Sequence, residues 1–340
     1  MEAAVSTVMD PRSIEREIAR IREKESNPYS SGVKTNLFTL VVFGDPPASS
    51  LQYMLGRRPA RIITIDQVDA PETGVTVSGR CFPDRRNRGV CFEEVRIESG
   101  ADGLGDDPGS WAPLLIRDLP VFAWLPDTLS GSDDHWQRPV LESASLIDKL
   151  IVDTGHASDD HGASLAAMRN LLALQEKAGG AFFISDFAWR RSRVLRELTA
   201  RAFDLLDTRP RLPVIKSVIL DGGFRADGLL FFLWLSTRLG WTRAGGAGIG
   251  SFRNRSGKEI SLVHATVGFP LSEGFRLRFS FEGAEEIAIG CTRGGCVSNG
   301  AERGAYKFPS DGEILLEEVD SLTRDPVYQE VLDRAGRIDG

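Results

Sequence analysis

The chain has 340 residues, 41% of them hydrophobic and 26% charged, which is enough apolar material for a large core and for two domains. Its formal net charge of −7 gives no general attraction to phosphate backbones or anionic lipids, so we expect neither nucleic acid nor membrane as a partner. The longest apolar run, residues 229–235, is far shorter than the roughly 20 residues that span a bilayer. The N-terminus lacks the features of a secretory signal, and four cysteines are too few for a disulfide scaffold. We therefore expect a cytoplasmic protein with reduced cysteines.

The first hundred residues predict a surface helix followed by strands. Isoleucines at helical spacing predict a helix over residues 13–25. Apolar, β-branched runs at 35–43 and 60–65, with a helical segment at 49–55 between them, predict a parallel strand-helix-strand unit. Alternating runs at 74–82 and 89–97 predict a hairpin, in which Cys81 and Cys91 flank the loop and could face each other.

The middle of the chain predicts further buried strands. Short continuous apolar runs at 120–125, 150–153 and 182–185 are separated by helical segments, a pattern typical of parallel strands covered on both faces. Residues 189–206 predict an amphipathic helix, with Val194, Leu195 and Leu198 on one face and arginines on the other.

A segment with two prolines, residues 207–213, marks the predicted domain boundary. We predict an α/β N-terminal domain over 1–207 with a mostly parallel central sheet, and an α+β C-terminal domain over 208–340 with antiparallel strands. The second domain is predicted to contain a strand at 215–220, a buried helix at 226–239 and a meander of strands at 260–267, 275–281 and 286–291. Two closing helices over 311–335 are broken at Asp325-Pro326.

Motifs for cofactor or metal chemistry are weak. None of the glycine clusters near 222, 245 and 294 has the full pattern of a phosphate loop, and the N-terminus carries no dinucleotide fingerprint, so we predict no cofactor. The run from His156 to His161 could bind a metal, but Ser and Asp there are better explained as the start of the following helix. No serine or cysteine lies in a recognisable nucleophile context.

Two sets of residues leave alternatives open. Asp153 and Asp186 each end a predicted strand, where they could meet in a ligand crevice or cap the helices that follow; we favour caps. Cys291 and Cys296 flank a turn with two glycines and could form a redox pair, although a reduced, structural role is the simpler interpretation.

Several segments resemble one family in the same order along the chain. They are Cys91-Phe92-Glu93-Glu94, the strand entry at 118–124, the segment 148–154, Asp186-Phe187-Ala188-Trp189-Arg190, the helix over 230–241 and the closing segment 314–328. Together they resemble the glucose-6-phosphate dehydrogenase assembly protein family, OpcA.

This resemblance implies a non-catalytic assembly factor and allosteric activator that binds glucose-6-phosphate dehydrogenase in the oxidative pentose phosphate pathway. Two alternatives are a sugar-phosphate-binding enzyme or sensor that uses Asp153 and Asp186, and a nucleic-acid regulator that uses the arginine face of helix 189–206. Because Arg and Trp often dominate interfaces, we expect that helix to help contact the dehydrogenase. The predicted contact residues are Trp124, Asp186, Trp189, Arg190, Arg193 and Arg196.

Overall fold

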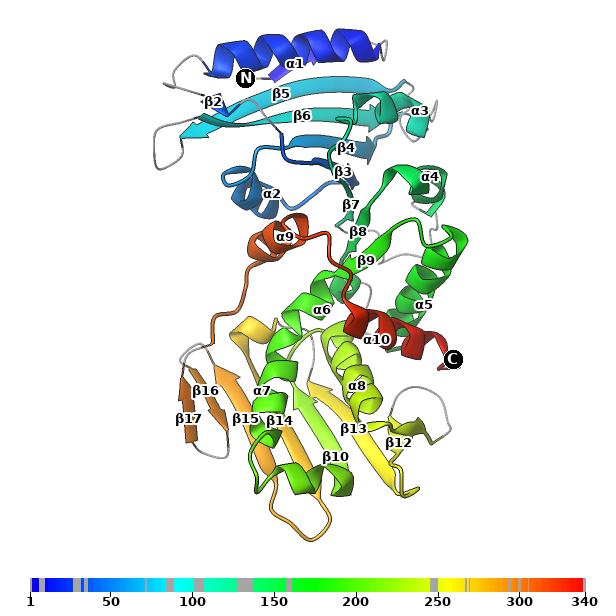
Figure 1. The fold of residues 1–340 in the computed structure, drawn as a ribbon, viewed down its shortest axis with the longest axis vertical. Coiled ribbons are helices and arrows are strands. Elements are labelled where there is room, and N and C mark those ends of the chain that lie inside the picture. The colour runs from blue at the N-terminus through cyan, green and yellow to red at the C-terminus, as the bar shows by residue number, and fades with distance from the viewer. Residues whose placement is uncertain are drawn as a thin grey trace. The chain divides into compact units, whose positions relative to one another are not determined.

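The protein is described by a computed structural model (Figure 1). The described residues are 2–5, 10–26, 32–33, 36–70, 72–83, 89–100, 107–126, 137–156, 161–244, 250–266, 268, 270–292, 295–298, 301–304 and 306–338. They form two compact units, each built from more than one stretch of the chain. No helix among them is long and apolar enough to cross a bilayer.

The first unit comprises residues 1–152, 174–185 and 310–324 and contains a nine-stranded sheet. Its main path runs β1-β5-β6-β4-β3-β7-β8-β9, and β2 pairs with β6. The strands are β1 (Glu2–Val5), β2 (Gly32–Val33), β3 (Thr39–Phe43), β4 (Arg61–Gln67), β5 (Gly74–Pro83), β6 (Gly89–Ser99), β7 (Val121–Leu125), β8 (Lys149–Val152) and β9 (Phe183–Asp186). β3, β4, β6, β7 and β8 pair in parallel, whereas β5 and β6 form the predicted antiparallel hairpin.

Helices pack on this sheet where the sequence pattern placed them. In α1 (Pro11–Ser26) the predicted stripe of Ile14, Ile18 and Ile21 is buried. α2 (Ala48–Leu55) packs against α9 (Asp311–Val319), and a Cβ at Gly312 would lie 2.6 Å from the Cβ of Tyr53, so the close approach of these helices requires glycine. The short helices α3 (Pro108–Trp111) and α4 (Gln137–Glu142) precede β7 and β8.

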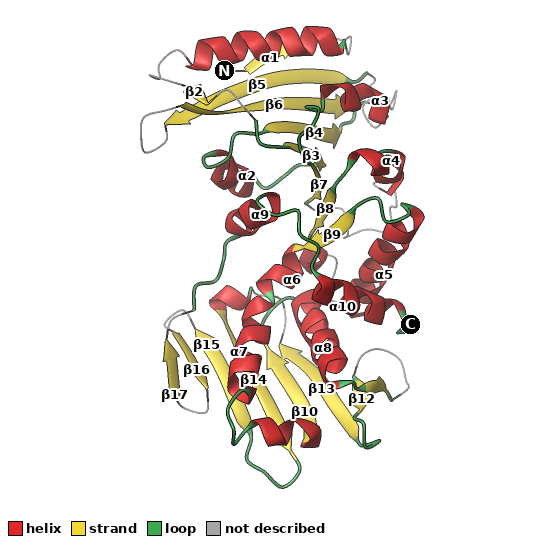
Figure 2. Cartoon of the chain, viewed as in Figure 1, coloured by secondary structure: helices red, strands yellow, loops and turns green. Residues whose placement is uncertain are grey.

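The second unit comprises residues 153–173, 186–309 and 325–340 and contains an eight-stranded sheet (Figure 2). The sheet order is β11-β12-β13-β10-β14-β15-β16-β17. The strands are β10 (Ile215–Asp221), β11 (Thr242–Arg243), β12 (Ser251–Arg253), β13 (Glu259–Thr266), β14 (Gly274–Phe281), β15 (Ile287–Thr292), β16 (Gly295–Ser298) and β17 (Ala301–Gly304). Apart from the parallel pair β10–β13, neighbouring strands are antiparallel. The predicted fold classes of both halves are therefore confirmed.

The second unit also holds most of the later helices, which are α6 (Phe187–Arg191), α7 (Arg193–Phe203), α8 (Arg225–Leu239) and α10 (Pro326–Gly336), while α5 (His161–Lys177) belongs partly to each unit. α8 is buried along most of its length, as its all-round apolar sequence predicted. The predicted single helix 189–206 is divided at Ser192, whose hydroxyl donates to the Trp189 carbonyl at 3.0 Å.

Two expectations differ from the structure. The compact units do not divide at 207/208, because α7 packs in the second unit, where Phe203 contacts Phe279 with ring centroids 5.1 Å apart, and α9 returns to the first. The predicted meander is wrong, because β10 is inserted between β13 and β14 and pairs with both.

Candidate functional site: a buried carboxylate cluster

The two strand-end acids, Asp153 and Asp186, lie close enough to affect each other's charge. Asp186 ends β9 and Asp153 follows β8, and the negative charge of Asp153 acts on the Asp186 carboxyl. Both side chains are buried, with only 5% of Asp153 and none of Asp186 exposed to solvent. The two acids therefore interact electrostatically inside the second unit, as the ligand-crevice alternative supposed.

Asp186 is held by four donors. It accepts from the Thr154 hydroxyl at 2.7 Å, from the Thr154 N–H at 3.2 Å, from the Ala188 N–H at 2.9 Å and from the Tyr328 hydroxyl at 3.0 Å. The Ala188 bond caps α6, which confirms the predicted capping role. Burial and then the charge of Asp153 raise the pKa of Asp186 to about 6, although the bonds from Thr154 and Ala188 oppose that shift.

Arg191 is the cation nearest these acids. Its two terminal nitrogens donate to the two oxygens of Asp153 at 2.6 and 2.8 Å, and its Nε lies 3.7 Å from Asp227 Oδ1. Asp227 is fully buried and accepts from the Phe224 N–H at 3.1 Å at the start of α8. Burial raises the pKa of Asp227 to about 7, while the charge of Arg191 opposes the shift.

A second layer of contacts interlocks two distant motifs. Tyr328 of α10 donates to Asp186, and in return Trp189 Nε1 of α6 donates to Asp325 at 2.8 Å. The rings of Trp189 and Tyr328 lie 5.5 Å apart, and the Arg196 guanidinium stacks on the Trp189 ring, 3.3 Å from its centroid. The segments Asp186–Arg190 and Asp325–Tyr328 are thus packed against each other.

The contacts of these acids hold helices and turns of the second unit together. Each of the three acids is nine-tenths buried or more and bonded to the backbone or to Arg191, so none offers a carboxylate to a substrate from solvent. Among the described residues, no group of three or more His, Cys, Asp and Glu side chains has the geometry of a metal site. The predicted His156–His161 segment lies mainly outside the described residues.

The strand order of the first unit is one that sheets binding dinucleotides also have. The series β6-β4-β3-β7-β8-β9 corresponds to the 3-2-1-4-5-6 order of doubly wound nucleotide-binding sheets, which bind phosphate at the first strand-to-helix turn. Here that turn reads Gly44-Asp45-Pro46-Pro47: its two prolines supply no N–H, and its carboxylate would repel a diphosphate. Arg96 pairs with this Asp45 at 2.8 Å and with Asp66, near the end of β4, at 3.2 Å. The residues present do not fit a dinucleotide.

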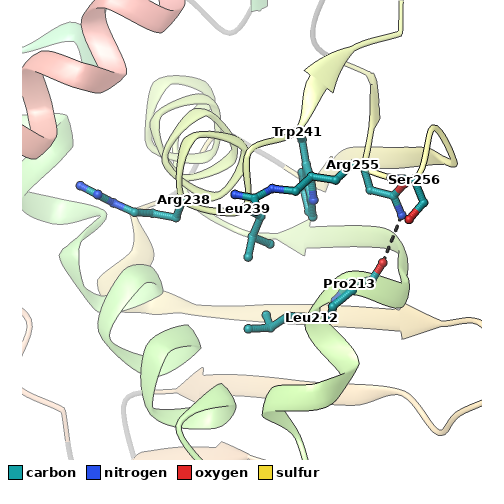
Figure 3. Close-up of a pocket in the computed structure, with 8 residues that line it drawn as sticks. Leu212, Pro213, Arg238, Leu239, Trp241, Arg255 and Ser256 are labelled. Atoms are coloured by element: carbon teal, nitrogen blue, oxygen red, sulfur yellow. Dashed lines mark hydrogen bonds between the residues drawn. The ribbon is translucent and has the colours of Figure 1, made fainter.

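A separate pocket of about 250 Å³ lies at the C-terminal end of α8 (Figure 3). Leu212, Leu239 and Trp241 supply apolar walls, and the Asn254 amide closes one side by donating to the Pro213 carbonyl at 3.1 Å. Arg238 at its edge is paired with Glu330 at 3.1 Å. The volume is at the small end for a ligand site, so we assign no ligand to it.

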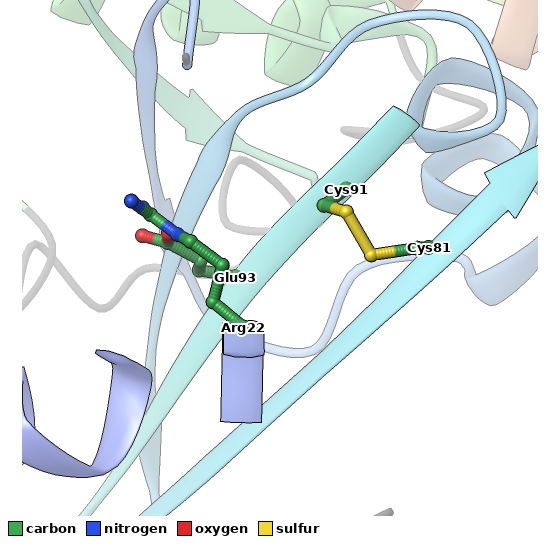
Figure 4. Close-up of a disulfide and its surroundings, with 4 residues drawn as sticks. All are labelled: Arg22, Cys81, Cys91 and Glu93. Atoms are coloured by element: carbon green, nitrogen blue, oxygen red, sulfur yellow. A yellow bond between two sulfur atoms is a disulfide. The ribbon is translucent and has the colours of Figure 1, made fainter. Parts of the chain in front are cut away.

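All four cysteines are paired, contrary to the expectation that they are reduced. Cys81 lies opposite Cys91 in the β5–β6 hairpin, and Cys291 opposite Cys296 in β15–β16. Direct cross-strand pairing brings the sulfurs together, which cysteine spacing alone did not establish. Near the first pair, the buried carboxylate of Glu93 pairs with Arg22 of α1 (Figure 4). A redox role for Cys291 and Cys296 stays a prediction.

The residues predicted to contact a partner are mostly internal. Trp124 in β7 is 2% exposed, Trp189 is 3% exposed and Asp186 is fully buried, so these three cannot offer their side chains to a docked surface. Arg196 is held by its bonds to the Trp189 carbonyl and the Ser192 hydroxyl. Partner contact stays a prediction for Arg190 and Arg193, which are partly exposed.

Sequence reasoning missed three members of the cluster. Arg191 follows Arg190 in the segment that was singled out, but nothing local showed that it turns toward Asp153. Asp227 is the only acid in the first turn of α8, and Tyr328 belongs to the closing Asp-Pro-x-Tyr segment. Each joins the cluster through a contact distant in sequence, such as the 142-residue separation between Tyr328 and Asp186.

The fold and this cluster define a two-unit protein, α/β and α+β, whose strand-end acids serve packing. The chain belongs to the OpcA family. Residues 53–170 match the family model described as the glucose-6-phosphate dehydrogenase subunit N-terminal domain, and residues 183–332 match the corresponding C-terminal domain.

Curated relatives agree with this assignment. The OxPP cycle protein OpcA of Nostoc punctiforme is 29% identical over 215 residues, covering 61% of this chain and 43% of the relative. The protein of the same name from Synechocystis is 25% identical over 245 residues, covering 70% of this chain and 47% of the relative. The chain thus spans less than half the length of either relative.

Two solved structures with a similar course of the chain are named as oxidoreductases. One from Thermotoga maritima has a TM-score of 0.40 and 12% identity, covering 87% of this chain and 94% of that one. One from Sinorhizobium meliloti has a TM-score of 0.41 and 11% identity, covering 88% and 95%. Similarities of this size do not transfer an activity.

Proposed function

We propose that the chain is a non-catalytic assembly factor and allosteric activator of glucose-6-phosphate dehydrogenase in the oxidative pentose phosphate pathway. The observation that carries this proposal is membership of the OpcA family, whose model descriptions name that dehydrogenase. Two places in the fold where an enzyme would be expected to bind its substrate or cofactor also support the proposal. The strand-end acids are bonded within the core, and the first strand-to-helix turn does not suit a diphosphate.

An activator of this kind needs no active site. It must bind the competent form of the dehydrogenase more tightly than the incompetent form, and its binding then shifts the population toward the competent form. A coupling free energy of about 1–3 kcal/mol changes apparent substrate affinity roughly 5–150-fold. A surface complementary to the dehydrogenase is sufficient for this task.

The alternative of a sugar-phosphate enzyme or sensor at Asp153 and Asp186 has less support. Arg191, the cation that could bind a phosphate there, is already bidentate to Asp153. A ligand would have to break that pair and enter a region where both acids are buried.

The test is steady-state kinetics of purified glucose-6-phosphate dehydrogenase from the same organism, with and without the chain. We expect the KM for glucose 6-phosphate to fall, or kcat to rise, in a saturable manner, and the chain alone to give no turnover. Unchanged kinetics and an unchanged oligomeric state of the dehydrogenase would refute the proposal. Turnover by the chain alone that is lost in Asp186→Asn would instead establish the enzyme alternative.

A further inference from the structure

Among the residues that the structure describes, the sheet of the second unit has one covered face and one open face. α7 and α8 lie over one face, where alternate residues such as Val218, Leu277 and Phe279 are buried. The residues between them point the other way, because side chains alternate along a strand. On this open side Val263 is 40% exposed and Val297 is 41% exposed.

The open face carries a row of small side chains. Strand register aligns four serines across it, in the order Ser251, Ser261, Ser217 and Ser280. The neighbouring row contains Val263, Ile219, Arg278 and Ala288. Ala265 and Gly290 also belong to this face, as the outward positions of β13 and β15. Small side chains let a second flat surface approach closely, whereas a solvated sheet face usually carries longer polar side chains.

The charges on this face favour a partner that is not a second copy of the chain. Along the described strands it carries the cations Lys216, Arg253, Arg276 and Arg278 and the acids Asp221 and Glu259. All four cations have acidic neighbours: Arg278 lies 3.6 Å from Asp221, Arg276 is also opposite Asp221, Arg253 is opposite Glu259, and the charge of Lys216 acts on Glu282. Because two of the cations share Asp221, the cations still outnumber these acids. Stacking two copies would bring this cationic excess against itself, whereas an acidic surface would complement it.

The size of the face is adequate for a stable complex. The eight strands are two to eight residues long; at about 3.3 Å per residue and about 4.8 Å between strands, they offer roughly 650 Å². Specific interfaces bury about 600–1,000 Å² on each partner. We propose that this open face, centred on Val263, Ile219 and Ala288, is the surface that docks onto a flat, acidic face of glucose-6-phosphate dehydrogenase; this inference rests on the function proposed above.

The experiment measures binding of the full chain to immobilised, purified glucose-6-phosphate dehydrogenase. Val263→Glu and Ala288→Glu place negative charge and bulk on the open face, at positions that already contact solvent, so the fold should survive; melting temperatures check this. Leu206→Glu is the matched control, because Leu206 is 92% exposed and lies just after α7, outside the sheet. We expect each face variant to weaken binding about tenfold or more, and the control to bind like the wild type.

Three results would overturn the proposal. The first is normal binding by both face variants together with a loss of binding by Arg193→Glu, whose residue belongs to α7 on the covered side of the sheet. The second is a wild-type chain that self-associates through this face, so that Val263→Glu yields monomers that still bind the dehydrogenase. The third is a wild-type chain that does not bind at all, which would also refute the proposed function, whereas the first two leave that function intact.

Discussion

Asp186, Thr154 and Tyr328 show how single residues join distant parts of the second unit. The carboxylate receives bonds from η4 (Thr154–His156), from the first turn of α6 and from α10. Isolated ionised carboxylates are costly to bury, and this one is stabilised by donors on every side. Sequence reasoning identified Asp153 and Asp186 as strand-end acids and predicted that they cap the helices that follow. It could not identify Arg191, Asp227 or Tyr328, because their contacts depend on tertiary packing.

Gly155 permits the bidentate pair between Arg191 and Asp153. A Cβ at this position would lie 2.1 Å from Arg191 Nη2 and 2.9 Å from Asp153 Oδ1. Gly155→Ala should therefore displace the guanidinium and lower the free energy of unfolding by about 1–3 kcal/mol. Chemical denaturation measures the change. Gly56→Ala is the control, since its Cβ would meet only the Gln52 carbonyl at 3.6 Å; equal stability of the two variants would count against this account.

The raised pKa values of Asp186 and Asp227 predict the pH dependence of stability. A carboxyl whose pKa is higher in the folded state than in the unfolded state stabilises the fold at low pH and loses that contribution as pH rises. For Asp227 the loss spans the interval from its ordinary value of 3.8 to about 7. Asp227→Asn should retain the bond from the Phe224 N–H without the charge. Its free energy of unfolding should therefore gain on that of the wild type as pH rises through this interval; parallel pH profiles would contradict the shift.

Among the elements, α9 depends on one buried ion pair. Lys149 of β8 is 1% exposed and pairs with the fully buried Glu318, and its ammonium also donates to the Glu318 and Ser321 carbonyls at 2.8 and 3.0 Å. Arg58 pairs with Asp320 at 2.7 Å nearby. α9 is therefore fixed to the sheet of the first unit, although it is separated from β8 by most of the second unit's sequence.

Lys149→Met should destabilise the first unit by about 3–5 kcal/mol, because the buried Glu318 carboxylate would lose this ammonium. Adding Glu318→Leu should restore part of the loss by removing the remaining charge. Equilibrium unfolding of both single variants and the double variant gives the coupling free energy. Strict additivity would show that the pair does not act as a unit.

At the level of elements, the sequence predicted most strands and helices but not all of their neighbours. Short continuous apolar runs marked β7, β8 and β9 because buried parallel strands leave no polar face. The same periodicity could not show that β10 inserts between β13 and β14, since alternation reports which face is buried and not which strand lies alongside. The cysteine pairs could be raised only as alternatives to reduced thiols for a similar reason, because pairing depends on register.

On the scale of the whole molecule, the two sheets differ in the surfaces that they could offer to a ligand or a partner. The first has the strand order of a nucleotide-binding sheet, yet its first turn contains Asp45, Pro46 and Pro47. The second has an open, weakly cationic face on which strand register aligns four serines. These features are consistent with a protein that acts through contact surfaces, and the family assignment supplies the dehydrogenase as the proposed partner.

The central claim is that this chain binds glucose-6-phosphate dehydrogenase directly. Size-exclusion chromatography with light scattering, on purified chain, purified dehydrogenase and their mixture, measures this without assuming any contact surface or kinetic effect. The account predicts a new, heavier species in the mixture whose mass equals a whole-number combination of the two proteins. Two separate peaks with unchanged masses, at concentrations well above the micromolar range, would contradict it.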